Sequence, residues 1–181
     1  MLEVFRFECR YQLRSPLFLI LSAAFFLLAF TLTASEQVSF GGVGNNLNFN
    51  AAWIIVFTQF FFSMIGMLAA VAIVAQAITR DYELKTAEML FATGIGEARF
   101  LLGRFLAGFV FAALIGVAAI IGTLLGTFAP WLDSERIGEF AIAPYVYALL
   151  VITIPNFFLS SALFFTAAAL TRSMIAAFAN W

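Results

Sequence analysis

The charged side chains of this chain gather in residues 79–105, a polar stretch in a sequence that is otherwise strongly apolar. The stretch carries the basic residues Arg80, Lys85, Arg99 and Arg104 and the acidic residues Asp81, Glu83, Glu88 and Glu97. Acidic and basic groups at helical spacing can form ion pairs and hydrogen bonds with a second protein. The chain contains no His and a single Cys, Cys9, so the commonest general base is missing and no cysteine metal cluster can form. We therefore expect a protein-binding segment here, and no catalytic residue, metal ion or cofactor in this chain.

Composition predicts that most of the chain lies in lipid. Hydrophobic residues make up 64% and charged residues 10% of the sequence, whereas a soluble domain is about a quarter charged. Four apolar runs are long enough to cross a hydrocarbon core, which needs about 20 residues. These runs are residues 16–34, 51–79, 100–129 and 141–170, and residues 174–181 begin a fifth. We expect an all-α membrane protein with a single, incomplete transmembrane domain over residues 1–181.

The basic residues predict the orientation of this domain. If successive spans alternate in direction, eight of the nine Lys and Arg residues fall on the side of the N-terminus, and only Arg136 falls on the other. The eight are Arg6, Arg10, Arg14, Arg80, Lys85, Arg99, Arg104 and Arg172. Cytoplasmic loops of membrane proteins carry an excess of Lys and Arg. We therefore expect a cytoplasmic N-terminus, external loops at residues 35–50 and 130–140, and a location in the inner or plasma membrane.

Residues 1–14 are predicted to form an amphipathic helix that lies in the membrane interface. At about 100° per residue, one stripe of this helix carries an acidic residue and three arginines. The stripe is Glu3, Arg6, Arg10 and Arg14. Apolar residues fill most of the remaining arc, and Glu8 is the single charge within it. Two interpretations remain open at this point: a plain juxtamembrane anchor, or a helix whose Glu8 and arginines also contact a cytoplasmic partner.

The few polar and small residues inside the spans predict helix packing. They are Gln59 and Ser63 in the second span, Gly122 and Gly126 in the third, and Pro155, which with Asn156 interrupts the fourth. Small residues let helix backbones approach closely, and amides hydrogen-bond between helices. A polar path for a substrate is the alternative interpretation of the same residues. At the start of the second span, we expect Asn50 to cap the helix.

Residues 80–99 are predicted to form a cytoplasmic loop between spans two and three, which is called the coupling loop below. A short helix over residues 81–91 would present an apolar face with a charged rim, and Thr93 and Gly94 would end it. The apolar face consists of Leu84, Met89 and Leu90, and the rim of Glu83, Lys85 and Glu88. Arg99 and Arg104 follow at the mouth of span three, where we expect them to reach the lipid headgroups.

The stretch RDYELKTAEMLFATGIGEARFLLGRFL resembles the first cytoplasmic loop of ABC exporter permeases of the type-2 superfamily. The matching positions are Arg80, Glu83, Thr86, Glu88, Leu90, Thr93, Gly94, Leu102, Gly103 and Arg104. Lys85 stands where the family often has Gly. The start of the chain, FRFECRYQLRSPLFLILSAAFFLLAF, with GGVGNNLNFNAAW after it, also looks like permeases that are sometimes fused ahead of a zinc aminopeptidase domain, although no peptidase is present in this sequence. Such permeases typically have six spans, so the resemblance implies the N-terminal part of a longer permease.

The resemblance also implies a mechanism in which a separate ATPase subunit pushes on the short helix of residues 81–91. This helix is called the coupling helix. The residues that would contact the ATPase are Asp81, Glu83, Leu84, Lys85, Thr86, Glu88, Met89, Leu90, Thr93 and Gly94. The sequence contains no GxxxxGK[ST] motif, so ATP would bind to the partner. The other implied partners are a second permease half or an identical copy, and membrane lipid, with no nucleic acid. The alternative function is a membrane anchor or assembly subunit of a cytoplasmic or fused enzyme that transports nothing.

Overall fold

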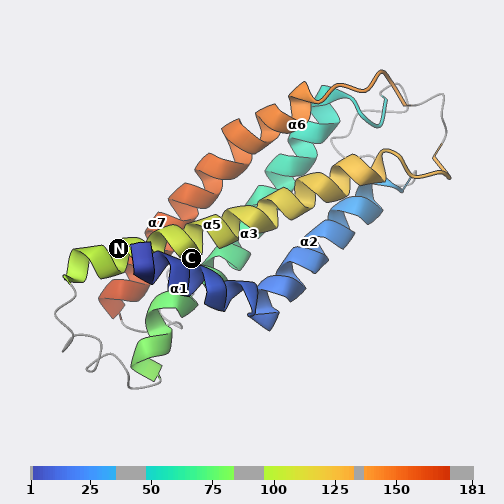
Figure 1. Ribbon diagram of the computed structural model, residues 1–181. Helices are drawn as coiled ribbons and strands as arrows, with labels where there is room; N and C mark the ends of the chain where they lie inside the picture. The colour runs from blue at the N-terminus through green and yellow to red at the C-terminus, as the bar shows by residue number, and fades with distance from the viewer. Residues whose placement is uncertain (1, 36–47, 84–95, 133–136, 172–181) are drawn as a thin grey trace. The chain divides into compact units, whose positions relative to one another are not determined.

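The computed structural model describes residues 2–35, 48–83, 96–132 and 137–171, and every regular element within them is helical (Figure 1). The elements are α1 (Leu2–Leu13), α2 (Pro16–Thr33), α3 (Ala52–Glu83), α5 (Glu97–Gly126), α6 (Ala143–Tyr147), the π-helix η2 (Ala148–Thr153) and α7 (Ile154–Thr171). Four stretches are long and apolar enough to cross a membrane: Pro16–Thr33, Ala52–Ala77, Ala98–Gly126 and Ala143–Leu170. The prediction of an all-α membrane protein with four spans is therefore confirmed.

The helix bounds differ from the predicted spans at the charged segment. Helix α3 continues to Glu83, so Asp81 belongs to the end of the long helix instead of starting a separate one. Helix α5 begins at Glu97 and ends at Gly126, ahead of the predicted end at residue 129. The rest of the coupling loop, residues 84–95, and the expected start of a fifth span at 174–181 lie outside the described residues.

The chain forms two compact units, each built from several separate stretches. Unit 1 consists of Met1–Leu19, Met67–Ala113 and Phe157–Trp181, and unit 2 of Ile20–Gly66 and Leu114–Asn156. In unit 1, a core of small and aromatic side chains joins α3, α5 and α7. Its buried members are Ala70, Val74, Ala112, Phe157 and Phe165. The small residues bring helices close and the phenylalanines fill the space between them, which is how packing holds helices together in lipid.

Two glycines of α5 face α2 in unit 2. A Cβ atom added at Gly122 would collide with the carbonyl oxygen of Phe26, and one at Gly126 would lie 2.8 Å from Cβ of Thr33. At both positions the added Cβ would lie closer to its neighbour than the Cβ atoms of real proteins do. The GxxxG spacing therefore places two positions without side chains on the face of α5 that contacts α2.

The polar residues of the second span contact the fourth span within unit 2. Nε2 of Gln59 donates to Oγ1 of Thr153 at 2.8 Å and to the carbonyl oxygen of Gly116 at 3.3 Å. Nδ2 of Asn156 donates to Oγ of Ser63 at 2.8 Å. In an apolar medium these bonds satisfy polar groups that would otherwise have no partner. Both polar positions of α3 are therefore part of the contact with the fourth span.

The expected interruption at Pro155 takes the form of a change in helix type. The helical backbone runs without a gap from Ala143 to Thr171, but Ala148–Thr153 is π-helical. Proline lacks an N–H and its ring clashes with the carbonyl group four residues earlier. A π-helix, which bonds residues five apart, accommodates such a local change.

The predicted cap at Asn50 is wrong, because its side chain bonds with another loop of unit 2. Oδ1 of Asn50 accepts a hydrogen bond from the N–H of Gly138 at 2.8 Å, and Nδ2 donates to the carbonyl oxygen of Gly138 at 2.7 Å. Nearby, Nε1 of Trp131 donates to the carbonyl oxygen of Ala34 at 2.8 Å. The bonds of Asn50 join the stretches that lead into α3 and α6, and that of Trp131 joins the stretches that follow α2 and α5. A local cap pattern in the sequence does not predict such long-range bonds.

Candidate functional site

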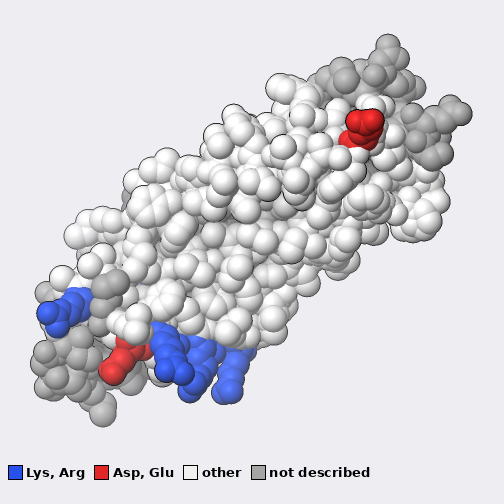
Figure 2. Space-filling model, turned by 45° about the horizontal axis from the view of Figure 1, so that its top comes forward, with Lys and Arg blue, Asp and Glu red and all other residues white. Residues whose placement is uncertain are grey.

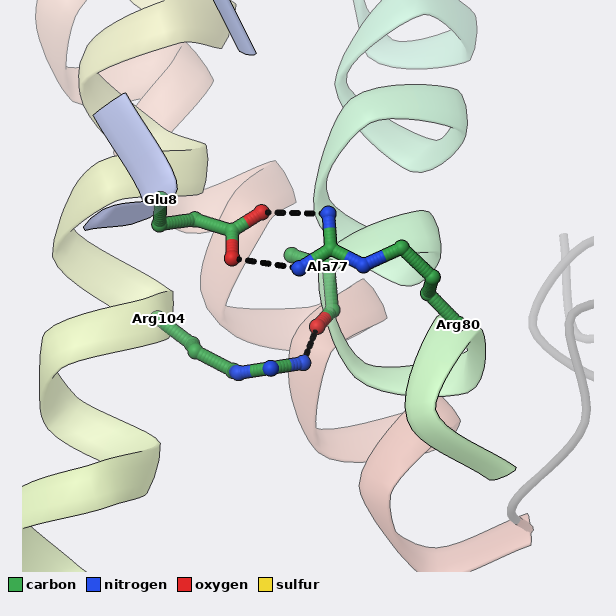
Figure 3. Close-up of polar contacts among 4 residues, drawn as sticks. All are labelled: Glu8, Ala77, Arg80 and Arg104. Atoms are coloured by element: carbon green, nitrogen blue, oxygen red, sulfur yellow. Dashed lines mark hydrogen bonds and ion pairs between the residues drawn. The ribbon is translucent and has the colours of Figure 1, made fainter. Parts of the chain in front are cut away.

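A buried ion pair joins α1 to the end of α3 in unit 1. The guanidinium group of Arg80 binds the carboxylate of Glu8 through two contacts, Nη1 to Oε1 at 3.2 Å and Nη2 to Oε2 at 2.9 Å (Figure 3). The side chain of Glu8 is fully buried and that of Arg80 is 11% exposed. A two-point Arg–carboxylate contact fixes both the distance and the direction of the two side chains. This pair therefore holds the entry helix against the last turns of α3.

An aromatic ring completes the environment of Arg80. Its Cζ atom lies 3.8 Å from the centroid of the Tyr11 ring, a cation–π contact. Burial by itself lowers the pKa of Arg80, but hydrogen bonding and attraction to the Glu8 carboxylate outweigh it, and the pKa is raised. Arg80 is therefore held in its charged form. Because Glu8 and Tyr11 both belong to α1, this helix contacts Arg80 from two positions.

A second arginine joins α5 to the same end of α3. The Nη1 group of Arg104 donates to the carbonyl oxygen of Ala77 (Figure 3), and its Cζ atom lies 4.6 Å from the ring centroid of Phe100. Arg104 is only 3% exposed, so the expectation that it reaches the lipid headgroups is wrong. A backbone carbonyl oxygen has two lone pairs, so that of Ala77 can accept this bond although it lies within the helix. We call Glu8, Tyr11, Ala77, Arg80 and Arg104 the helix joint.

The placement of Glu8 corrects one part of the interpretation in which α1 contacts a cytoplasmic partner. Glu8 and Gln12 are one helical turn apart and both are fully buried, whereas Arg6, Arg10 and Arg14 are exposed. The hypothesis that Glu8 contacts such a partner is therefore wrong, and a contact through the arginines stays a prediction. The sequence did contain a signal for the true partner of Glu8, namely a single acidic residue in an apolar arc and a basic residue at the end of a span. A buried charge requires an opposite charge, but the pattern alone does not say which one.

The thiol of Cys9 lies beside this ion pair, and its titration gives a test of the burial of α1. Burial, together with the negative charge of Glu8, raises the pKa of the Cys9 thiol. The thiolate is the reactive form, so alkylation of Cys9 by a maleimide should need a higher pH than alkylation of an exposed thiol. The comparison is the variant Cys9→Ser with Leu13→Cys, because Leu13 is exposed on the same helix. Equal pH profiles for the two proteins would contradict this arrangement of α1.

The residues predicted to contact an ATPase lie at and beyond the end of α3. Asp81 and Glu83 belong to its last turn. The others, Leu84, Lys85, Thr86, Glu88, Met89, Leu90, Thr93 and Gly94, lie outside the described residues. The structure therefore describes the two helices that flank residues 84–95, and the joint that connects them to each other and to α1.

Within the part of the chain that the structure describes, no group of three or more His, Cys, Asp or Glu side chains could hold a metal ion.

The contacts of the joint can fix the positions of three helices relative to one another within unit 1. The joint is buried and hydrogen-bonded, so its contacts should persist when one of the helices is displaced. Such an arrangement suits the transmission of a movement from one helix to its neighbours.

Comparison with known proteins identifies the family. A family model described as an ABC-2 family transporter protein matches residues 2–181. No curated protein and no solved structure matches the chain. The match includes α1, the four helices that are long and apolar enough to cross a membrane, and the charged segment between α3 and α5. This multi-pass membrane protein therefore belongs to the ABC-2 family of transporter proteins.

Proposed function

We propose that this chain is the membrane-spanning permease subunit of an ATP-driven ABC exporter, driven by a separate cytoplasmic ATPase subunit. Membership of the ABC-2 family supports a role in transport. The absence of a GxxxxGK[ST] motif from the sequence supports ATP binding by a partner. The excess of basic residues predicted on one side supports a cytoplasmic N-terminus and a cytoplasmic position for residues 84–95. A second permease half or an identical copy would complete the transport pathway.

The observation that carries this proposal is the helix joint. Residues 84–95 connect the end of α3 to the start of α5, and a force on this segment would act first on those two helix ends. Arg80 and Ala77 lie in the last turns of α3, where they contact α1 and α5 respectively. A displacement of α3 by a cytoplasmic subunit would therefore be passed to both neighbouring helices through polar contacts.

The proposal is tested at Leu90, one of the apolar residues of the predicted coupling helix. Leu90→Asp should abolish the ATP hydrolysis that the permease stimulates in its ATPase and should reduce co-purification of the two proteins, because a charge would replace an apolar anchor at an interface. Glu83→Ala is the comparison, since charges at the rim of an interface contribute little. Both variants must retain the unfolding temperature of the unmodified permease. If Leu90→Asp retains full stimulation and co-purification, the coupling role fails, and an anchor that transports nothing becomes the better explanation.

A further inference from the structure

One face of α1 is strongly basic and is turned away from the rest of unit 1. Arg6, Arg10 and Arg14 are spaced four residues apart, so they form a row along the helix, and all three are exposed. The opposite face carries the buried Glu8 and Gln12. The ion pair with Arg80 prevents α1 from turning about its axis, so the row has a fixed direction. Figure 2 shows Lys and Arg side chains gathered on one part of the surface.

No acidic side chain of the described residues pairs with the arginines of this row. Among the described residues, the ion pair between Arg80 and Glu8 is the one found, and no arginine of the row takes part in it. Glu3 is the only acidic side chain that α1 exposes. It lies before the row, one helical turn from Arg6. The row therefore presents a net positive surface to an anionic partner.

Exposed apolar side chains border the row on both sides, which favours lipid over protein as that partner. On a helical projection, Leu2 and Leu13 lie along one edge and Phe7 along the other, and these side chains are 80%, 58% and 62% exposed. Arginines between apolar side chains suit the boundary between headgroups and acyl chains, because the apolar groups enter the lipid while the guanidinium groups reach the phosphates. An acidic protein surface would leave these apolar side chains against polar groups.

The position of α1 in the chain brings the row to the membrane surface. Arg14 is separated only by Ser15 from Pro16, the first residue of a candidate membrane span. The end of α1 must therefore lie close to the headgroups at one end of that span. Since the three arginines lie on one line, the whole row can reach this layer if the helix lies along the surface.

We propose that Arg6, Arg10 and Arg14 form a binding surface for the phosphate groups of anionic phospholipids. Phe7 and the exposed leucines insert at its edges. The surface orients α1, and through Glu8 and Arg80 it also orients the end of α3. This binding does not depend on the ATPase and can be measured on the permease alone.

The test uses the full chain in nanodiscs of phosphatidylcholine, with and without phosphatidylglycerol. Phosphatidylglycerol should raise the unfolding temperature of the unmodified protein, and the rise should fall with added salt because salt screens exposed charges. In a mixed-lipid titration, each Arg→Gln change should weaken phosphatidylglycerol binding roughly fivefold. The triple variant should show no rise in unfolding temperature. Arg99→Gln is the matched control, since Arg99 is an exposed arginine of unit 1 outside the row.

A triple Arg→Lys variant guards against loss of folding, because it keeps the charge and should keep most of the effect. If the triple Gln variant does not fold, the single variant Arg10→Gln together with the Lys variant decides the question. An equal response to phosphatidylglycerol in the unmodified protein and in the Gln variants overturns the proposal. If the Gln variants respond to phosphatidylglycerol as the unmodified protein does but no longer co-purify with the ATPase, the proposal is also overturned. The row then belongs to the binding surface for a protein partner. Failure of Leu90→Asp to uncouple the ATPase would leave the lipid result unaffected.

Discussion

Replacing Glu8 with alanine is expected to destabilise unit 1 by about 3–5 kcal/mol, because removal of one partner of a buried ion pair leaves an uncompensated charge. Arg80 would keep its positive charge, and among its described contacts the Tyr11 ring would remain against it. Since α1 is attached to α3 through this pair, the loss should also weaken any response of α1 to movement of α3. The measurement is thermal unfolding of the purified protein, followed by tryptophan fluorescence.

Three matched variants separate the charge effect from a general weakness of α1. Glu3→Ala, on an exposed position of the same helix, should change the free energy of unfolding by less than about 0.5 kcal/mol. Glu8→Gln keeps a hydrogen-bond acceptor and should fall between the two. The double change of Glu8 to leucine and Arg80 to methionine should recover most of the loss, because an apolar pair can replace a buried ion pair. If Glu8→Ala and Glu3→Ala have the same small effect, the ion pair does not stabilise the joint.

Replacing Gly122 with alanine is expected to destabilise unit 2 by about 1–3 kcal/mol, the usual cost of overpacking. The sign is the informative part, because alanine is intrinsically better than glycine inside a helix by about 0.5–1 kcal/mol. The added Cβ would collide with the carbonyl oxygen of Phe26 and would lie 3.1 Å from the backbone nitrogen of Phe30. These are backbone atoms, so they can yield only if α2 moves away from α5.

The control for this change is Gly96→Ala. An added Cβ at Gly96 meets no atom within 4 Å, so the variant should unfold at nearly the temperature of the unmodified protein. Gly126→Ala should destabilise in the same direction as Gly122→Ala, since its nearest neighbours include Cβ of Thr33 at 2.8 Å and the carbonyl oxygen of Phe30 at 3.0 Å. Unchanged or raised stability in both α5 variants would show that α2 does not pack closely on α5.

Some features of the site could be predicted because they depend on residue type and local spacing. The three arginines of α1 are spaced four residues apart, which predicts a row on one face of the helix. The row is exposed, as the polar face of an amphipathic helix should be. The GxxxG spacing of Gly122 and Gly126 likewise predicts a face that admits another helix. The spacing does not identify the helix that packs on this face. The structure shows that this helix is α2 in unit 2.

Other features were missed because two equally local preferences competed. Arg104, at the start of an apolar helix, can extend to the headgroups or donate to a backbone carbonyl group of a neighbouring helix. The position of Ala77 on α3 selects the bond to the carbonyl group. Asn50 can cap a helix or bind a neighbouring loop, and the proximity of Gly138 selects the second. In both cases, burial away from water makes the long-range hydrogen bond the better choice.

The sequence by itself determined that this is an all-α membrane protein with four spans, and it predicts that eight of its nine basic residues lie on one side of the membrane. The length and polarity of a run act locally, since each stretch must satisfy its own backbone in lipid. Only the tertiary structure decided that Glu8 pairs with Arg80, 72 residues away, and that Arg104 of α5 donates to the carbonyl oxygen of Ala77 in α3. A buried charge needs an opposite charge or a carbonyl dipole close by, and which group meets it depends on how the helices pack.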